Sequence, residues 1–325
     1  MSFQAIRGQA AAKRLLQNGL RHDKLSHAYI FSGPIGTGRA EMAVALAKAV
    51  YCSTMVEDAC GECLECRKVE HHNHADLHIV EPDGASIKIE QIRQLQKEFA
   101  YRATASGTKI YIIHQAEKMT AAAANSLLKF LEEPASKVIA ILITENGNAL
   151  LPTIQSRAQW ISFTPMPRDD LIWSLLQEGH PEVLVRPAAH MAAGIEAAKE
   201  LIVSNWFAEM RNVVLQLAKE TLTRFPSSIV TVQQKLIKTE LAEHMSNIFD
   251  LLILWFKDMV QLRLGRRDKL VFMDQLDWME SLASGKEVSD WVRMMEQAVQ
   301  LQKRLRFNAN TQLVVEKMLV EIQGV

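Results

Sequence analysis

Four cysteines lie within one short stretch of the chain, in the pattern C-x7-C-x2-C-x2-C: Cys52, Cys60, Cys63 and Cys66. Thiolates at such short separations suit a tetrahedral Zn²⁺, and Gly61 supplies the backbone freedom that a tight turn between ligands needs. Because four protein ligands leave no open position on the metal, the predicted role is structural and not catalytic. A redox dithiol and an iron–sulfur cluster are the alternatives.

Four histidines follow the cysteines closely in the sequence. Their spacing fits no clean ligand set once the cysteines are assigned to the metal. We therefore predict that all four are solvated loop residues: His71, His72, His74 and His78.

A glycine-rich loop follows a strand-like run and precedes an alanine-rich helical stretch. Gly33 and Gly38 frame the pattern G-x-x-x-x-G, with Gly36 between them, so backbone N–H groups at a helix N-terminus could cradle phosphate. The next two residues depart from the phosphate-loop pattern. Arg39 stands where a lysine reaches the β- and γ-phosphates, and Ala40 stands where a hydroxyl ligates Mg²⁺. An arginine can still bind phosphate as a cation, but a methyl group cannot hold a metal.

The acidic pair that a hydrolysing P-loop enzyme carries after a later strand is also missing. The strand-like residues 109–113 end in His114 and Gln115, where carboxylates would hold Mg²⁺ and orient water. Losses in two separate motifs predict that the chain does not hydrolyse ATP. The loop is then either an empty strand-to-helix turn or a nucleotide site without turnover.

The elements that must position these residues form an N-terminal half that ends near Pro165 and Pro167. Five short apolar runs rich in β-branched or aromatic residues predict buried parallel strands: residues 27–33, 77–81, 109–114, 138–144 and 160–163. Longer segments with helical spacing predict crossover helices between them: residues 39–50, 89–101 and 120–133. The alternation predicts a doubly wound α/β sheet.

The remainder of the chain has helical periodicity and almost no glycine. The spacing of apolar residues predicts two or three short helices in residues 168–203 and about five more in residues 205–323. The stretch 245–264 is apolar almost all round, so it must be covered on every side, either at the centre of a bundle or at an oligomer interface. We expect three domains: residues 1–166 with the cysteine module at 52–66, a small helical lid at 167–204, and a helical domain at 205–325.

The composition excludes several classes of protein. A chain of 325 residues, with 48% hydrophobic and 23% charged residues, is typical of a soluble globular protein of two or three domains. Because 37 basic residues balance 37 acidic ones, any contact with nucleic acid must come from a local patch. No apolar run approaches the ~18 residues of a membrane span, and no secretory h-region stands at the N-terminus, so we expect a cytoplasmic protein without membrane partners.

Three ordered motifs carry a family resemblance. Residues 109–119, 125–134 and 151–157 together resemble the AAA+ clamp-loader subunits of bacterial DNA polymerase III. The similarity covers nearly the whole chain; it is strongest over residues 1–165 and weaker over residues 308–316. The degenerate P-loop, the missing acidic pair and the cysteine module make the chain resemble the delta-prime type and not the ATP-hydrolysing gamma/tau type.

The resemblance implies a definite architecture and set of partners. The fold would be an α/β AAA+ P-loop domain, with a parallel five-stranded sheet flanked by helices, followed by a small helical lid and an all-α collar for oligomerisation. The partners would be gamma/tau and delta subunits in a hetero-pentamer, and through that complex the sliding clamp and primed DNA. The protein would be bacterial and associated with the replisome.

The resemblance also assigns individual residues. Arg157 matches the Ser-Arg-Cys motif that supplies an arginine finger in trans to a neighbouring ATP site, although Ala158 replaces the usual Cys. A surface salt bridge is the alternative role for Arg157. Thr144 matches the sensor-1 region, or it simply caps its strand. Residues 192–198 resemble the sensor-2 stretch without an evident arginine.

The leading interpretation is a non-hydrolysing clamp-loader subunit with no ATPase or polymerase activity of its own. One alternative is an active ATPase motor of the gamma/tau type, against which Ala40, His114 and Gln115 speak. Another is a zinc-dependent nucleic-acid-binding module with an incidental α/β fold. Zero net charge and 6% aromatic residues disfavour that module as an autonomous DNA binder.

Overall fold

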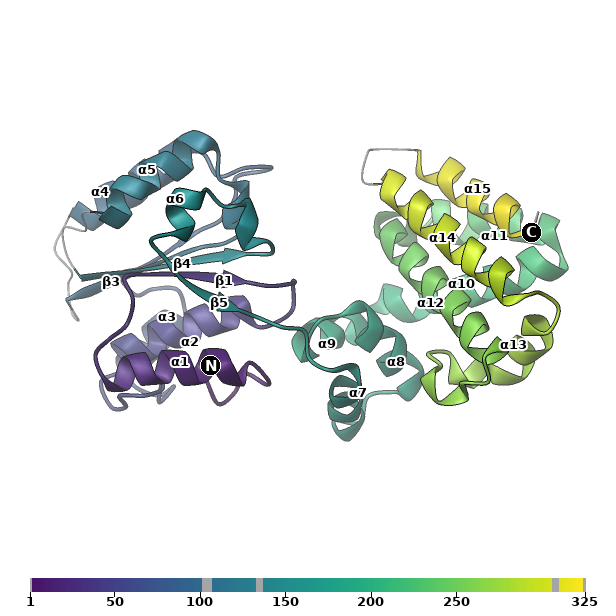
Figure 1. Cartoon of the computed structure of the whole chain (residues 1–325), viewed down its shortest axis with the longest axis horizontal. Helices are drawn as coiled ribbons and strands as arrows, with labels where there is room; N and C mark the ends of the chain where they lie inside the picture. Colours follow the sequence, from purple (N-terminus) through teal and green to yellow (C-terminus); the bar gives the residue numbers. More distant parts are fainter. Residues whose placement is uncertain (1, 101–106, 133–136, 306–309, 324–325) are drawn as a thin grey trace. The chain divides into compact units, whose positions relative to one another are not determined.

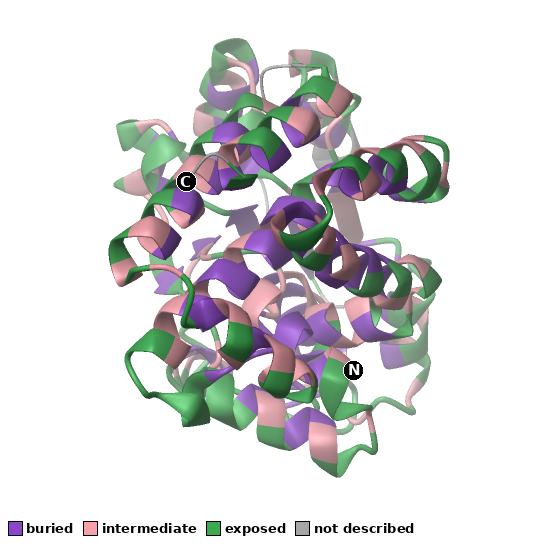
Figure 2. Ribbon diagram, turned by 90° about the vertical axis from the view of Figure 1, so that its right-hand side faces the viewer, coloured by how far each residue is buried: buried purple, intermediate pink, exposed green. Residues whose placement is uncertain are grey.

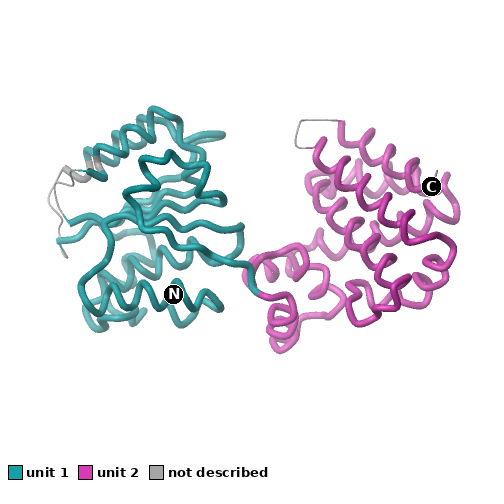
Figure 3. The backbone as a smooth tube through the Cα atoms, in the orientation of Figure 1, with its two compact units in different colours: residues 1–166 teal, residues 167–325 magenta. Residues whose placement is uncertain are grey.

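The structure, a computed structural model, describes residues 2–100, 107–132, 137–305 and 310–323. Within the predicted elements and motifs, residues 101, 133–134 and 308–309 lie outside the described residues. The chain divides into two compact units, residues 1–166 and residues 167–325 (Figure 3). Every helix in the described ranges is too short or too polar to span a bilayer.

The first unit is built on one sheet of five parallel strands in the order β2-β3-β4-β1-β5. The strands are β1 (Ala28–Ser32), β2 (Leu77–Val80), β3 (Thr108–Ile113), β4 (Lys137–Thr144) and β5 (Gln159–Ser162). The central strands are almost continuous apolar runs because both faces of the sheet are covered. Each strand agrees with its predicted range to within one residue.

Alternate side chains of the strands enter two cores on opposite faces of the sheet. Tyr29 and Phe31 of β1 belong to one core, and Ala28 and Ile30 belong to the other. Figure 1 shows the helices that cover each face. The first face is covered by α1 (Ala10–Arg21), α2 (Arg39–Tyr51) and α3 (Leu64–Glu70), and the second by α4 (Ile89–Ala100), α5 (Ala121–Glu132) and α6 (Pro152–Gln155).

The second unit contains no strand among its described residues. It begins with three short helices, α7 (Arg168–Gln177), α8 (Glu182–Met191) and α9 (Ile195–Val203). Six further α-helices follow within the described ranges: α10 (Asn205–Thr223), α11 (Phe225–Thr231), α12 (Met245–Arg263), α13 (Leu276–Ala283), α14 (Val288–Leu305) and α15 (Thr311–Gln323). The sequence predicted about five, one fewer, and α11, with seven residues, is too short to show a clear helical period.

The apolar stretch predicted around residues 245–264 forms α12 and packs within the chain. Phe249, Trp255 and Phe256 have no exposed surface. α12 contacts α8, α10, α13 and α14, so its apolar residues are covered on nearly every side. Figure 2 shows how buried and exposed residues occupy different faces of the helices. The predicted fold class, a five-stranded parallel sheet flanked by helices and followed by an all-α region, is confirmed.

A buried carboxylate on α12 holds the chain that leads to α13. Oδ2 of Asp258 accepts the N–H groups of Val271 and Phe272, both at 2.8 Å. Burial raises the pKa of Asp258 from 3.8 to about 6, although these two N–H groups and Lys257 oppose the shift. Oδ1 has no hydrogen-bond partner in the described part of the chain. The hydrogen bonds to Oδ2 therefore only partly replace the water that the ionised carboxylate of Asp258 loses on burial.

We expect ionisation of Asp258 to weaken the second unit as the pH rises. A carboxyl group with a raised pKa in the folded state stabilises the fold fully below its unfolded pKa, near 3.8, and loses that contribution as the pH rises through about 6. Relative to Asp258→Asn, the free energy of unfolding of the wild type should fall by about 2 kcal/mol between pH 4 and pH 6. Urea titrations of both proteins measure this difference. A difference that does not change with pH would contradict the expectation.

Candidate functional site

The glycine-rich loop leaves the carboxyl end of β1 and enters α2. Gly33 has no room for a side chain, because a Cβ there would lie 2.2 Å from the carbonyl oxygen of Phe163. Gly36 and Gly38 both have a φ of 83°, a left-handed conformation that favours glycine. All three glycines are therefore required by the course of the backbone, with or without a phosphate.

Arg39, at the first position of α2, is 8% exposed and lies among carboxylates. Burial lowers its pKa below the usual 12.5, and the charges of Glu145, Glu117 and Glu41 oppose that shift. These carboxylates favour the charged guanidinium, and they would repel the negative charge of a nucleotide. Ala40 beside it offers no oxygen for Mg²⁺. The loop thus lacks both side chains that normally act on a triphosphate.

The residues that follow β3 lie at the same edge of the sheet as the loop. Burial lowers the pKa of His114 below 6.5, against the charges of Glu81 and Glu41, so its imidazole is neutral at pH 7. Gln115 is exposed and has a φ of 48°. A neutral ring and an amide therefore stand where a hydrolysing enzyme carries carboxylates.

Thr144 ends β4 directly beside the loop. It is fully buried, its carbonyl accepts the N–H of Gly33 at 3.2 Å, and its hydroxyl accepts the N–H of Asn146 at 3.2 Å. The hydroxyl thus caps the end of the strand, which is the alternative to a sensor role.

The four predicted metal ligands converge at one place beyond the end of α2. The sulfur atoms of Cys52, Cys60, Cys63 and Cys66 all lie within 4.8 Å of one another, with those of Cys60 and Cys66 3.9 Å apart. A tetrahedral zinc with bonds of ~2.3 Å separates its sulfurs by ~3.8 Å, so the cluster fits this ion. The cluster could hold a metal with four protein ligands and no open position.

Backbone groups around the cluster favour thiolates. The N–H groups of Cys60, Cys63 and Cys66 point at the sulfurs of Cys52, Cys60 and Cys63, at 3.5, 3.3 and 3.5 Å. Burial opposes ionisation of Cys63 and Cys52, but hydrogen bonds outweigh it and lower the pKa of Cys63 to about 6 and that of Cys52 to about 7. Burial raises the pKa of Cys66 to about 12, so metal binding would have to displace the proton of that thiol.

Two of the ligands lie at the start of α3, a helix that the sequence analysis did not predict. Cys63 is its N-cap residue and Cys66 lies in its first turn. The helix has seven residues, too few for a recognisable apolar period. Gly61, with a φ of 78°, supplies the turn that was expected between the second and third ligands.

For His74, the prediction of a solvated loop residue is wrong. It is 5% exposed and stacks on Tyr51 with ring centroids 3.8 Å apart. Its Nδ1 accepts a backbone N–H at 3.2 Å, and its Nε2 lies 3.2 Å from a carboxylate oxygen of Glu65. The spacing of the cysteines gives no information about the contacts of His74 with Tyr51 and Glu65. The prediction is also wrong for His78, which lies in β2 and is half-buried. His71 and His72 are exposed, as predicted.

Arg157 lies in the short connection between α6 and β5. Its guanidinium donates to the carbonyl of Thr153 at 3.0 Å and pairs with Glu132 at 2.7 Å, with 38% of its side chain exposed. β5 is parallel to β1, so Arg157 lies at the amino edge of the sheet and the glycine-rich loop at the carboxyl edge. Strands of this length, at ~3.3 Å per residue, separate the two edges by ~15 Å. The sequence-predicted residues therefore gather in separate places, and Arg157 is remote from the loop of its own chain.

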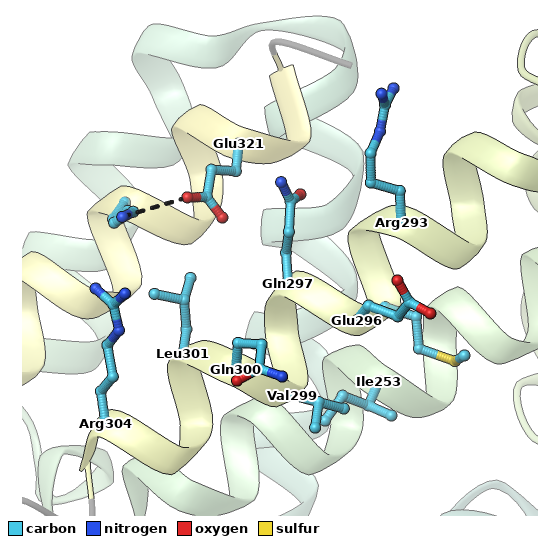
Figure 4. Close-up of a pocket in the computed structure, with 11 residues that line it drawn as sticks. Ile253, Arg293, Glu296, Gln297, Val299, Gln300, Leu301, Arg304 and Glu321 are labelled. Atoms are coloured by element: carbon cyan, nitrogen blue, oxygen red, sulfur yellow. Dashed lines mark ion pairs between the residues drawn. The ribbon is translucent and has the colours of Figure 1, made fainter.

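The second unit has a groove of its own between α12, α14 and α15 (Figure 4). Its volume is about 660 Å³, and Ile253, Gln297 and Glu321 line it, one from each helix. Glu321 pairs with Lys317 at 3.5 Å. None of the predicted site residues lies in this groove.

Known proteins match both units. A family model described as "DNA polymerase III, delta subunit" matches residues 8–167, and one described as "DNA polymerase III, delta subunit, C terminal" matches residues 204–324. DNA polymerase III subunit delta' of Bacillus subtilis is 35% identical over 318 residues, which cover 97% of this chain and 96% of that protein. The chain belongs to the family of DNA polymerase III delta' subunits. The predicted family resemblance is thereby confirmed.

Two other similarities concern related subunits. DNA polymerase III subunit tau of Bacillus subtilis is 37% identical over 163 residues, which cover 50% of this chain and 29% of tau. A solved structure of a gamma subunit-related protein from Thermotoga maritima aligns with a TM-score of 0.46 and 20% identity, over 97% of this chain and 98% of that chain.

We expect the purified protein to carry about one zinc ion per chain, held until the cysteines are modified or the chain unfolds. Cys66→Ser removes a buried ligand, so it should lose the metal and lower the temperature of thermal unfolding. Glu62→Gln, an exposed change between two ligands, is the matched control and should keep both. Elemental analysis of anaerobically purified protein measures the metal. A metal-free wild type would refute the site.

Proposed function

We propose that this delta' subunit is a non-hydrolysing member of a clamp loader. It assembles with gamma/tau and delta subunits, acts with them on the sliding clamp and primed DNA, and offers Arg157 as an arginine finger to a neighbouring ATP site. The position of Arg157 carries the proposal: its side chain is partly exposed at the sheet edge opposite its own glycine-rich loop. From there it is suited to serve a nucleotide on another molecule.

The state of the subunit's own loop supports the absence of turnover. Arg39 is buried and under the charge of three carboxylates, Ala40 cannot ligate Mg²⁺, and His114 and Gln115 replace the acidic pair. The hydroxyl and the acidic pair that a hydrolysing site uses are thus replaced in both motifs. The loop is therefore empty or holds a nucleotide without hydrolysis.

A guanidinium suits the role of a finger. It is permanently charged, and its planar fork can bind two oxygens of a transferring phosphoryl group as charge develops there. Such fingers contribute ~10³–10⁵ in turnover in well-studied systems. In the free chain, Glu132 holds the guanidinium in an exposed pair, and exposed pairs contribute only ~0–1 kcal/mol, so a phosphate can replace this carboxylate readily.

The remaining parts of the proposal concern architecture. The four cysteines hold Zn²⁺ as a structural ion that fixes the module at residues 52–66. Residues 167–204 form a small lid domain, and residues 205–325 form a collar through which the subunits join. Contacts of α8 with α12 and of α9 with α10 connect these two parts within the second unit.

Reconstitution with gamma/tau and delta subunits tests the finger. Arg157→Ala should leave folding and assembly intact, and should lower turnover at the site that it serves by ~10³ or more. The DNA-stimulated ATPase rate of the complex should fall by the fraction that this one ATP site contributes to it. Glu132→Gln is the matched control: it removes the intrachain partner and keeps the guanidinium, so turnover should persist. Unchanged ATPase in an Arg157→Ala complex of normal composition would remove the assignment.

The isolated chain should show no Mg²⁺-dependent ATP hydrolysis above background, because Ala40 replaces the hydroxyl that ligates the ion and His114 and Gln115 replace the acidic pair. Phosphate release from the purified wild type measures this directly. The ATPase subunit of the same complex, assayed alone, is the positive control. Hydrolysis at a comparable rate by this chain would overturn the non-hydrolysing role.

A further inference from the structure

The N-terminal segment, residues 2–9, lies against the glycine-rich loop. Nε2 of Gln9 donates to the carbonyl of Thr37 at 3.1 Å and to a second backbone carbonyl at 2.7 Å. A methyl carbon of Ile6 lies 3.4 Å from the position that a Cβ on Gly38 would occupy. The segment therefore contacts the loop where the loop enters α2.

The other end of this segment is bonded to the cysteine module, residues 52–66. The N–H of Phe3 donates to Oδ1 of Asp58 at 2.9 Å, and the N–H of Ala59 donates to the same oxygen at 2.7 Å. Phe3 has no exposed surface and Asp58 is 4% exposed, so these bonds are shielded from water. Losing such a buried acceptor leaves two backbone donors without partners, which is costly.

Bonds from α1 complete the connection. Nε and a terminal nitrogen of Arg21 donate to the two carboxylate oxygens of Glu57 at 2.7 and 2.6 Å. Lys13 donates to the carbonyl of Ile6. The two parallel bonds from Arg21 fix the orientation of Glu57 in the cysteine module. Because this ion pair is exposed, it contributes little to the free energy of folding. The module, α1 and the N-terminal segment thus form one network that ends at the glycine-rich loop.

We propose that the cysteine module anchors the N-terminal segment through Asp58, and that the anchored segment limits access of nucleoside phosphates to the glycine-rich loop. Residues 52–60 contain no helix or strand, so their course depends on the metal assigned to the cysteines under the proposed function. Release of the metal frees Asp58 from its position and loosens the segment. Metal occupancy then governs how far the loop is covered.

Hydrogen exchange on the full-length, metal-loaded chain tests the anchor. Asp58→Ala removes the acceptor, whereas Asp58→Asn, the matched control, keeps an oxygen that accepts both N–H groups. Amides of residues 3–9 should exchange about tenfold faster in Asp58→Ala than in the wild type, and at nearly the wild-type rate in Asp58→Asn. Elemental analysis should find the same metal content in all three. Equal exchange in the wild type and Asp58→Ala overturns the anchor.

Binding of a fluorescent ADP analogue tests access to the loop. Apparent affinity scales with the fraction of molecules whose loop is uncovered, so Asp58→Ala and the metal-stripped wild type should bind up to about tenfold more tightly than the metal-loaded wild type. Faster exchange without tighter binding overturns the effect on access. Slow exchange in the metal-stripped wild type overturns the role of the metal. Neither readout uses the ATPase of the reconstituted complex, so the finger proposal is tested separately.

Discussion

Burial of the sheet on both faces is the constraint on which every site in the first unit depends. Phe31 and Ile30 enter opposite cores, so a slip of one residue in register would exchange both and is strongly disfavoured. The fixed register sets Ser32 beside Thr144, and with them the loops that follow β1 and β4. The same constraint holds Arg157 at the other edge. Separation of the loop from the finger is thus a property of the sheet and not of the loops.

Local patterns in the sequence were enough to predict the sheet, the loop and the cysteine cluster. Near-continuous apolar runs between turn residues identify buried parallel strands, and ligand spacing is itself a short-range signal. Contacts between residues far apart in the chain carried no such signal. Asp58 meets Phe3, and Glu132 meets Arg157, only because the folded cores bring their elements together. α1 is different, since the helical spacing of its apolar residues could have been found in the sequence.

The glycine-rich loop differs from a hydrolysing P-loop in the charges around it as well as in its missing catalytic groups. Glu117 stands two residues beyond Gln115, so a carboxylate is present near the place where one would hold Mg²⁺. One of its oxygens accepts the N–H of Glu145 at 3.4 Å, and its charge acts on Arg39. The charges of the cation and the acids that would meet a nucleotide and its metal instead act on one another. The three carboxylates favour the charged form of Arg39 without a ligand, although burial still lowers its pKa.

The ion pair between Arg157 and Glu132 orders the side chain of the proposed arginine finger before the subunits assemble. A free guanidinium on a long side chain samples many rotamers, and fixing it on a phosphate costs conformational entropy at that moment. The carbonyl of Thr153 and the carboxylate of Glu132 hold it near one geometry in the unassembled chain. A triphosphate carries more negative charge than one carboxylate and presents several oxygens, so it competes well for the same fork. The pair is therefore strong enough to order the side chain and weak enough to be exchanged, which a buried salt bridge would not allow.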